Sequence, residues 1–284
     1  MDNIIEIKGL CKQYQDFRLD NLNLTIAPGT ITGLVGANGA GKSTTLKLML
    51  NLIRRDAGSI KIFGMDNIAD EAAVKKDIGV VFDEPCFHDQ LTPAHISGYM
   101  AGLYPDWDDK LFRRYLQQFS LPDSKVVKDF SRGMKMKLSI AAALSHRPKL
   151  LLLDEPTSGL DPLVRDEILD IFLEYLQAED HAILLSSHIT SDLDKIADTI
   201  ALLDHGRLLF HEEKDELRDK YVLVKGGDGL LETIGRDRMV GVRKNQFGFE
   251  GLCLRENLPR MAGLETERPT IEEIMLFFTR GERK

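Results

Sequence analysis

Two short segments contain residue types that suit phosphate chemistry. The first, Gly36 to Ser43, has the sequence GANGAGKS and fits the pattern G-x-x-x-x-G-K-[ST], with an apolar segment before it and a helical pattern after it. Its glycines let the backbone turn tightly and aim N–H groups inward, and the N-terminus of the following helix adds positive potential. Such a loop holds the phosphates of a nucleotide. The predicted nucleotide-binding residues are Gly36, Asn38, Gly39, Ala40, Gly41, Lys42, Ser43 and Thr44.

The second segment is the carboxylate pair Asp154 and Glu155, which follows the apolar run Leu150 to Leu153. Such a run is typical of a buried parallel strand, and open α/β sheets bind ligands outside the carboxyl ends of their strands. Lys42 is expected to reach the β- and γ-phosphates, while Ser43 and Asp154 ligate Mg²⁺. Glu155 then remains free to act as a base. A glycine-rich turn without nucleotide is the less favoured alternative, because the strand with its Asp-Glu pair is also present.

A parallel sheet is needed to bring these two segments together. Four apolar runs are predicted to form it: Thr30 to Val35, Ile78 to Phe82, Leu150 to Leu153 and Ala182 to Ser186. Two strand-like segments, Ile4 to Ile7 and Leu22 to Ile26, predict an antiparallel layer beside the nucleotide. Between residues 84 and 147 the pattern becomes helical, with candidate helices over Ala94 to Tyr104, Asp109 to Phe119 and Arg132 to Leu144. The sequence therefore predicts an α/β fold with a helical subdomain.

The order of the motifs resembles that of the ATP-binding subunits of ABC transporters. The loop Phe130 to Met134, FSRGM, precedes the apolar strand, DEPTSGLD follows it, and Ser186-Ser187-His188 lies at the next strand end. The resemblance covers residues 1 to about 217 and implies a P-loop NTPase of the ABC ATPase type, with ATP and Mg²⁺ as cofactors. It also implies that two such chains pair head to tail, with each ATP between the phosphate loop of one and the Ser-Arg-Gly loop of the other.

Individual residue roles follow from the same resemblance. Tyr14 would stack on the adenine ring, and Ser131 and the Gly133 N–H would face the γ-phosphate of the partner chain. Asp161 matches the loop that crosses to the partner. His188 matches the switch histidine, which would hold the γ-phosphate and the attacking water while Glu155 deprotonates that water. Taken alone, a tyrosine or a histidine at a strand end is more often structural.

Two segments depart from the family pattern. Asp83 stands where the family has glutamine, at the end of the segment Val74 to Pro85, and is expected to contact the metal through water and to assist catalysis. In FSRGM, which replaces LSGGQ, Met134 cannot donate the hydrogen bonds of a glutamine. Arg132 either contacts phosphate or the facing subunit, or is a solvated arginine at a helix start. In the family that the chain resembles, SRGM-type loops occur in cassettes that serve ABC-2-type exporters, so these departures imply that subfamily.

Composition limits the partners and the location. A net charge of −8 over 284 residues argues against a nucleic-acid partner. No apolar run approaches the ~18 residues that a membrane helix needs, and no signal peptide is visible. The three cysteines, Cys11, Cys86 and Cys253, lack metal-binding spacing. We therefore expect a cytoplasmic chain that is not inserted in the membrane. The resemblance implies that a separate transmembrane permease subunit holds it at the inner face.

Two regions leave alternatives open. The apolar residues of the helical subdomain either line a groove for the permease or belong to the core; they are Phe87, Tyr99, Met100, Leu103 and Tyr104. Residues 218–284 are predicted to form a small α+β extension, dimerising or regulatory. It begins with a strand over Tyr221 to Val224, and a capping box at Thr270 to Glu273 precedes its last helix.

The leading functional hypothesis is an ATP-hydrolysing motor of an exporter. One alternative is a soluble ABC-type ATPase that acts on nucleic acid or the ribosome. The other is a regulatory ATP-binding module with little hydrolysis, which fits Met134 and Asp83 but not the intact Glu155 and His188. The second ATP-binding subunit could be a copy of this chain or a different one.

Overall fold

The computed structural model describes residues 3–84, 86–246, 248–259 and 264–280. Its central strands are β3 (Ile31–Val35), β6 (Ile78–Val81), β7 (Leu150–Asp154), β8 (Ala182–Ser187), β9 (Thr199–Asp204) and β10 (Arg207–Glu213). They form a six-stranded sheet in the order β10-β9-β3-β8-β7-β6, and only β9 and β10 pair antiparallel. The four predicted parallel strands are confirmed, and the sequence did not reveal β9 and β10.

The central sheet is buried on both faces, which explains its continuous apolar strands. Leu151 and Leu153 of β7 belong to one core, and Leu150 and Leu152 belong to the other. The alternation follows from the strand geometry, in which successive side chains point to opposite faces. A strand that is covered on both faces therefore needs an apolar residue at every position, which is the pattern from which the buried parallel strand was predicted.

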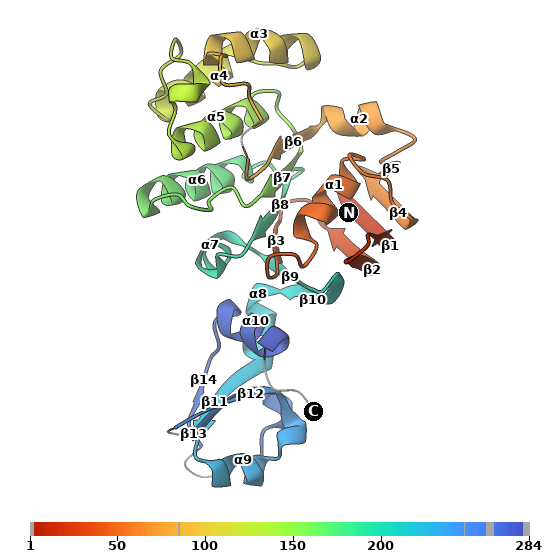
Figure 1. The fold of residues 1–284 in the computed structure, drawn as a ribbon, viewed down its shortest axis with the longest axis vertical. Helices are drawn as coiled ribbons and strands as arrows, with labels where there is room; N and C mark the ends of the chain where they lie inside the picture. The colour runs from red at the N-terminus through yellow and green to blue at the C-terminus, as the bar shows by residue number, and fades with distance from the viewer. Residues whose placement is uncertain (1–2, 85, 247, 260–263, 281–284) are drawn as a thin grey trace.

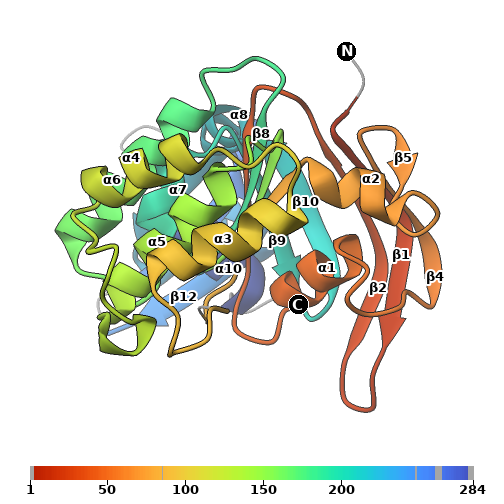
Figure 2. The ribbon, with the colours of Figure 1, turned by 90° about the horizontal axis from the view of Figure 1, so that it is seen from above.

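The antiparallel layer covers one face of this sheet together with helix α1 (Lys42–Met49). Its strands are β1 (Ile5–Gln13), β2 (Arg18–Ile26), β4 (Ala57–Ile62) and β5 (Met65–Asp66), in the order β2-β1-β4-β5, and helix α2 (Glu71–Lys76) follows. In Figure 2 the layer stands on one side of α1, away from the helical subdomain. Strands β1 and β2 are longer than predicted, because buried Leu10 and Leu19 continue their apolar face toward the hairpin.

The helical subdomain lies at one end of the molecule (Figure 1) and contains α3 (Pro93–Leu103), α4 (Asp109–Gln118) and α5 (Arg132–Leu144). A short 3₁₀ helix, Val127–Asp129, precedes α5. The three predicted helices are confirmed to within one residue at each end. Side-chain caps begin them, since Thr92, Asp108 and Ser131 each accept a hydrogen bond from the first turn of their helix. Two further helices, α6 (Pro162–Tyr175) and α7 (Thr190–Ile196), pack beneath this region.

The residues after β10 lie at the opposite end in Figure 1. They form helices α8 (Lys214–Lys220), α9 (Asp228–Ile234) and α10 (Ile271–Arg280), and strands β11 (Tyr221–Gly226), β12 (Met239–Asn245), β13 (Gly248–Leu254) and β14 (Thr266–Glu267). Two 3₁₀ helices, Arg236–Arg238 and Arg255–Asn257, connect them. The strands form an antiparallel sheet in the order β12-β13-β11-β14. The capping box of α10 is confirmed: Thr270 N donates to Glu273 at 2.7 Å, and Glu273 N donates to Thr270 at 3.2 Å.

This C-terminal sheet shares a core with the rest of the chain. Leu223 and Phe277 belong to the same buried cluster as Leu193 of α7, while Val222 and Val224 face a separate small cluster with α9. Leu217, at the predicted domain boundary, is itself fully buried in the shared cluster. The division into residues 1–217 and 218–284 therefore stays a prediction.

Every helix in the described ranges is too short or too polar to cross a lipid bilayer.

Candidate active site

The phosphate loop connects β3 to α1 and is held by close packing. A methyl group at Gly36 would lie 2.3 Å from the backbone oxygen of Leu203, so only glycine fits there. Gly41, the N-cap of α1, has φ of 114°, a backbone conformation that favours glycine. The Gly206 N–H donates to Ala40 O at 3.0 Å, which ties the loop to the turn between β9 and β10. The loop is thus fixed by strand β9 as well as by its own glycines.

Lys42 connects this loop to the carboxylates at the end of β7. Its side chain is only 6% exposed, and Nζ donates to Gly36 O at 2.8 Å. The same Nζ lies 3.2 Å from Oε1 of Glu155. Although this ion pair is close, Glu155 Oε1 accepts no hydrogen bond from the described residues. A buried carboxylate oxygen at this point is available to another donor.

Glu155 is also held from β8. Its Oε2 lies 2.6 Å from Nδ1 of His188 and accepts a hydrogen bond from the His188 backbone N–H at 3.2 Å. The ring contact suits an imidazole that is protonated on Nδ1, because an ionised carboxylate only accepts. Glu155 itself has φ of 52°, so the chain turns sharply after β7 and directs the carboxylate toward the phosphate loop.

Asp154 is buried beside the loop at the end of β7. Its Oδ1 accepts a hydrogen bond from Ser186 Oγ at 2.5 Å, and these two residues are paired in the register of β7 and β8. Ser43 lies at the start of α1 in the same cavity. A buried carboxylate and a hydroxyl are hard oxygen donors of the kind that Mg²⁺ takes, usually with several waters and the phosphates of the substrate. The residues present therefore fit a Mg²⁺ that binds together with a nucleotide.

A cavity of about 690 Å³ lies over the phosphate loop. The predicted residues that line it are Asn38, Gly39, Gly41, Lys42, Ser43, Thr44, Asp83, Asp154 and Glu155. Gly36 and Ala40 are buried in the loop itself. Neither Tyr14 nor His188 contributes to the lining, although His188 contacts it through Glu155.

Four lining residues were not predicted, namely Asp16, Phe17, Ala37 and His205. Phe17 lies in the hairpin between β1 and β2, where the Tyr14 N–H donates to Phe17 O at 2.7 Å. The Tyr14 ring is 41% exposed, and its centroid is 6.3 Å from that of Phe17. The sequence feature that could have indicated Phe17 is that it is a second aromatic residue, three positions after Tyr14. The adenine-stacking role predicted for Tyr14 stays a prediction, and of the two rings only Phe17 lines the cavity.

Asp83 lies at the edge of this cavity and has an unexpected partner. It follows β6, is half-exposed, and accepts a hydrogen bond from Arg132 Nη2 at 2.5 Å. Within the chain Arg132 is therefore paired with Asp83 and half-exposed, and its contact with phosphate or a facing subunit stays a prediction. Pro85, the last residue of the segment predicted to resemble the family's loop, lies outside the described residues.

Ser131, Gly133 and Asp161 lie apart from the phosphate loop and do not line its cavity. Ser131 is the N-cap of α5, and its Oγ accepts from Met134 N at 3.2 Å. Asp161 is the N-cap of α6 and accepts from Val164 N at 3.1 Å. The two helix starts are adjacent, because a methyl group at Gly133 would meet Val164 at 3.7 Å. One chain therefore does not bring the two predicted halves of the nucleotide site together.

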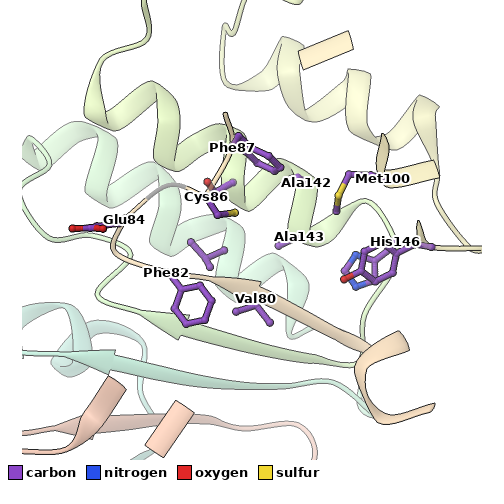
Figure 3. A pocket seen from close by; sticks show the side chains of 12 residues that line it. Val80, Phe82, Glu84, Cys86, Phe87, Met100, Ala142, Ala143 and His146 are labelled. Atoms are coloured by element: carbon purple, nitrogen blue, oxygen red, sulfur yellow. The ribbon is translucent and has the colours of Figure 1, made fainter. Parts of the chain in front are cut away.

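A second cavity, of about 220 Å³, lies in the helical subdomain. Figure 3 shows its lining side chains, which come from β6, α3, α5 and the segment after β6. Of the five residues predicted for a groove or core, Phe87, Met100 and Tyr104 line this cavity, whereas Tyr99 and Leu103 are exposed on α3.

Comparisons with known proteins agree with this geometry. Residues 19–158 match the family model described as ABC transporter. The chain is 31% identical to the daunorubicin resistance ATP-binding protein DrrA3 of Streptomyces coeruleorubidus, over all of this chain and 98% of that protein. It is 34% identical to the bacitracin transport ATP-binding protein BcrA of Enterococcus faecalis, over 81% of this chain and 77% of that protein. The chain belongs to the ABC transporter family.

Solved structures show the same architecture for this ABC ATPase. The structure of an ATP-binding subunit of an ABC transporter superposes with a TM-score of 0.70 and 28% identity, over 76% of this chain and 92% of that one. A dimeric cassette, MJ0796 bound to ADP and Pi, shares the fold at 21% identity with a TM-score of 0.66, over 74% of this chain and 98% of that one. The predicted fold class, a P-loop NTPase of the ABC ATPase type, is confirmed. The chain is an ATP-binding and ATP-hydrolysing subunit of a transporter, and the soluble alternative is not favoured.

Proposed function

We propose that this ABC ATPase drives export through a separate transmembrane permease subunit, working as one of two ATP-binding chains arranged head to tail. The observation that supports the proposal most is the position of Glu155. It lies between Lys42 and His188 at the phosphate loop, whereas Ser131 and Gly133 are outside that cavity. One chain thus offers a base and a phosphate loop but lacks the donors on the far side of the nucleotide.

ATP binding would change the partner of Lys42. In this structure its ammonium group lies 3.2 Å from Glu155 Oε1. The β- and γ-phosphates of ATP would take over this cation, together with the N–H groups of the loop and the positive end of α1. Ser43 and Asp154, with Asp83 through water, would hold the Mg²⁺, which neutralises charge on the β- and γ-phosphates.

Glu155 would then act as the general base for hydrolysis. Its Oε1 is buried and accepts no hydrogen bond from the described residues, so it can accept the proton of an attacking water. His188 would keep the carboxylate in place through Nδ1 and direct its other ring nitrogen toward the γ-phosphate. General-base help of this kind typically contributes about 10² to 10⁴ in rate.

The second chain would complete the site. Ser131 and the backbone N–H of Gly133 lie at the exposed start of α5, where they can donate to the γ-phosphate of a facing cassette. Asp161, next to them at the start of α6, would contact that chain. The dimer could form from two copies, because this chain has both halves of the site.

The permease subunit would dock on the helical subdomain. The cavity lined by Phe87, Met100 and Tyr104 and the exposed α3 side chains Tyr99 and Leu103 offer an apolar surface beside β6. The transport names of the relatives support a membrane partner. On this proposal the chain is cytoplasmic and peripheral, at the inner face of the membrane.

Purification from solubilised membranes tests the partner. A tagged chain is expressed in its own host, extracted with detergent, and the bound proteins are identified by mass spectrometry. We expect a polytopic membrane protein in stoichiometric amount, and we expect it to be lost when Tyr99 and Leu103 are both changed to Ser. Recovery of the tagged chain with ribosomes or DNA, and no membrane protein, would contradict the proposal.

A further inference from the structure

Two of the residues that depart from the family pattern, Asp83 and Arg132, form one ion pair. They are 49 residues apart in sequence, yet Arg132 Nη2 donates to Asp83 Oδ1 at 2.5 Å. Asp83 lines the nucleotide cavity and also a neighbouring cavity of about 330 Å³, to which Arg132 contributes. The pair therefore joins the edge of the nucleotide site to the start of α5.

The position of Arg132 is unfavourable for the stability of its own helix. It is the first residue of α5, whose first turn contains no acidic residue, so its charge opposes the positive end of the helix dipole. Asp83 offsets this charge from outside the helix. A cation at this place is better explained by a negative ligand than by helix formation.

The guanidinium group of Arg132 packs closely against the backbone at Gly159. A methyl group at Gly159, which has φ of 68°, would lie only 3.2 Å from Arg132 Nη1. Gly159 therefore permits both the left-handed backbone and the close approach of the arginine. The group is half-exposed, and it lies beside Ser131, the residue that the proposed function directs at the facing ATP.

We propose that Arg132 contacts the triphosphate of the facing cassette, and that Asp83 is the counter-ion that positions it before the cassettes pair. The inference rests on the proposed head-to-tail dimer. Within one chain the guanidinium group is paired with Asp83 and half-exposed. When the facing triphosphate arrives, the guanidinium exchanges one carboxylate for phosphate oxygens, which match its planar donors in two-point contacts.

An exchange of this kind is energetically reasonable. The ion pair is about half exposed on both sides, and such surface pairs contribute little stability, so the cis contact is weak enough to be replaced. A triphosphate has more negative charge than a single carboxylate. Arg132 would also supply the donors that Met134 lacks at the end of the same loop.

The test is a double-mutant cycle on dimer formation, not on turnover. All variants are made in a Glu155→Gln parent, and dimerisation with ATP is measured by sedimentation velocity. Arg132→Ala is expected to weaken the dimer by about tenfold or more, the size of a lost hydrogen bond to a charged group. Lys135→Ala is the matched control, because it removes a cation from the same helix that pairs with Asp89 instead; it should leave the dimer within about twofold.

The variant Asp83→Asn tests whether Asp83 positions Arg132 as its counter-ion or only contacts it at the surface. With Arg132 present, it should strengthen the dimer by up to about fivefold, because the competing contact within the chain is gone. In the Arg132→Ala background the same change should not strengthen the dimer, because no arginine is left for the carboxylate to hold. Equal effects of Asp83→Asn in both backgrounds would overturn the positioning role of Asp83.

The outcomes also separate this inference from the proposed function. A parent that dimerises with ATP, and that Arg132→Ala leaves equally tight, overturns the inference alone. A parent that binds ATP but never dimerises overturns the head-to-tail proposal as well. Binding of ATP by the monomer, measured by calorimetry at concentrations below dimerisation, should be unchanged in Arg132→Ala and thus supports an effect on pairing.

Discussion

The phosphate loop and the Ser-Arg-Gly loop differ in how far their groups are packed and partnered within a single chain. At the phosphate loop, Gly36 is packed against the backbone of Leu203, and Lys42 is buried with two oxygen partners within 3.2 Å. At the other loop, the nearest side chain to an added methyl at Gly133 is 3.7 Å away, and Arg132 is half-exposed. Buried polar groups need partners inside the chain, whereas groups that face a second molecule must stay accessible. The contrast suggests that one loop is complete and the other serves a neighbour.

The largest expected effect comes from Glu155→Gln at the completed side. Glutamine keeps the size of the side chain but cannot accept the proton of water, so turnover should fall by about 10² to 10⁴. ATP binding should persist, because Lys42 and the loop are unchanged. Steady-state ATPase assays with a nucleotide-binding assay check both parts. Turnover at the wild-type rate would remove Glu155 from the role of base.

A methyl group added to the phosphate loop should cost stability. Gly36→Ala would force the end of β9 to move, because the clash at 2.3 Å is with backbone. We expect a loss of about 2 to 3 kcal/mol in the free energy of unfolding, measured in urea. Gly39→Ala is the matched control: it has open space and only the strain of φ at 82°, so it should cost about 1 kcal/mol. Equal losses would show that packing does not distinguish the two glycines.

A glycine-to-alanine change in the Ser-Arg-Gly loop should reduce turnover without reducing stability. Gly133→Ala finds ordinary contact distances and a helical backbone, so it should leave the stability unchanged or raise it by up to about 1 kcal/mol. Turnover should nevertheless fall about tenfold if the methyl stands between this loop and the facing phosphate, because one hydrogen bond is lost at the transition state. Melting temperature and ATPase rate are measured together. Undiminished turnover would place the facing phosphate elsewhere.

The smallest effect concerns the other end of α5, where His146 is buried. Its ring stacks on Tyr104 at 4.0 Å and its Nε2 donates to Ile78 O at 3.1 Å. Burial lowers the pKa of His146 below its usual 6.5. Below about pH 6.5 the unfolded chain binds a proton at His146 that the folded chain does not bind. The contribution of His146 to stability is therefore complete above about pH 6.5 and is lost as the pH falls from there toward the lower folded pKa.

Thermal unfolding measured between about pH 5 and pH 8, the interval in which histidine normally titrates, checks this expectation. His146→Gln should reduce the slope of stability against pH, whatever its effect on stability itself. Part of the slope should remain, because burial also lowers the pKa of His211. An identical slope in the variant would exclude His146 as a contributor.

Local patterns were sufficient to predict the elements that are buried or capped. The strand Leu150–Asp154 was recognisable because both of its faces are covered, and α10 because Thr270 and Glu273 cap it reciprocally. The β9 and β10 strands were missed because β10 forms the edge of the sheet and the place of β9 depends on its pairing with β3. Phe17, in the β1–β2 hairpin, and His205, in the turn between β9 and β10, reach the nucleotide cavity only because both turns lie beside the phosphate loop.

The sequence alone determined which residues can do the chemistry, because the spacing of Lys42 and Ser43 in one loop, and the succession of Asp154 and Glu155 after an apolar strand, are local features. Only the tertiary structure decided the partners of these groups. It placed Glu155 between Lys42 and His188, and it paired Asp83 with Arg132 across 49 residues. Contacts between distant segments depend on how strands and helices pack, and a linear pattern does not contain that information.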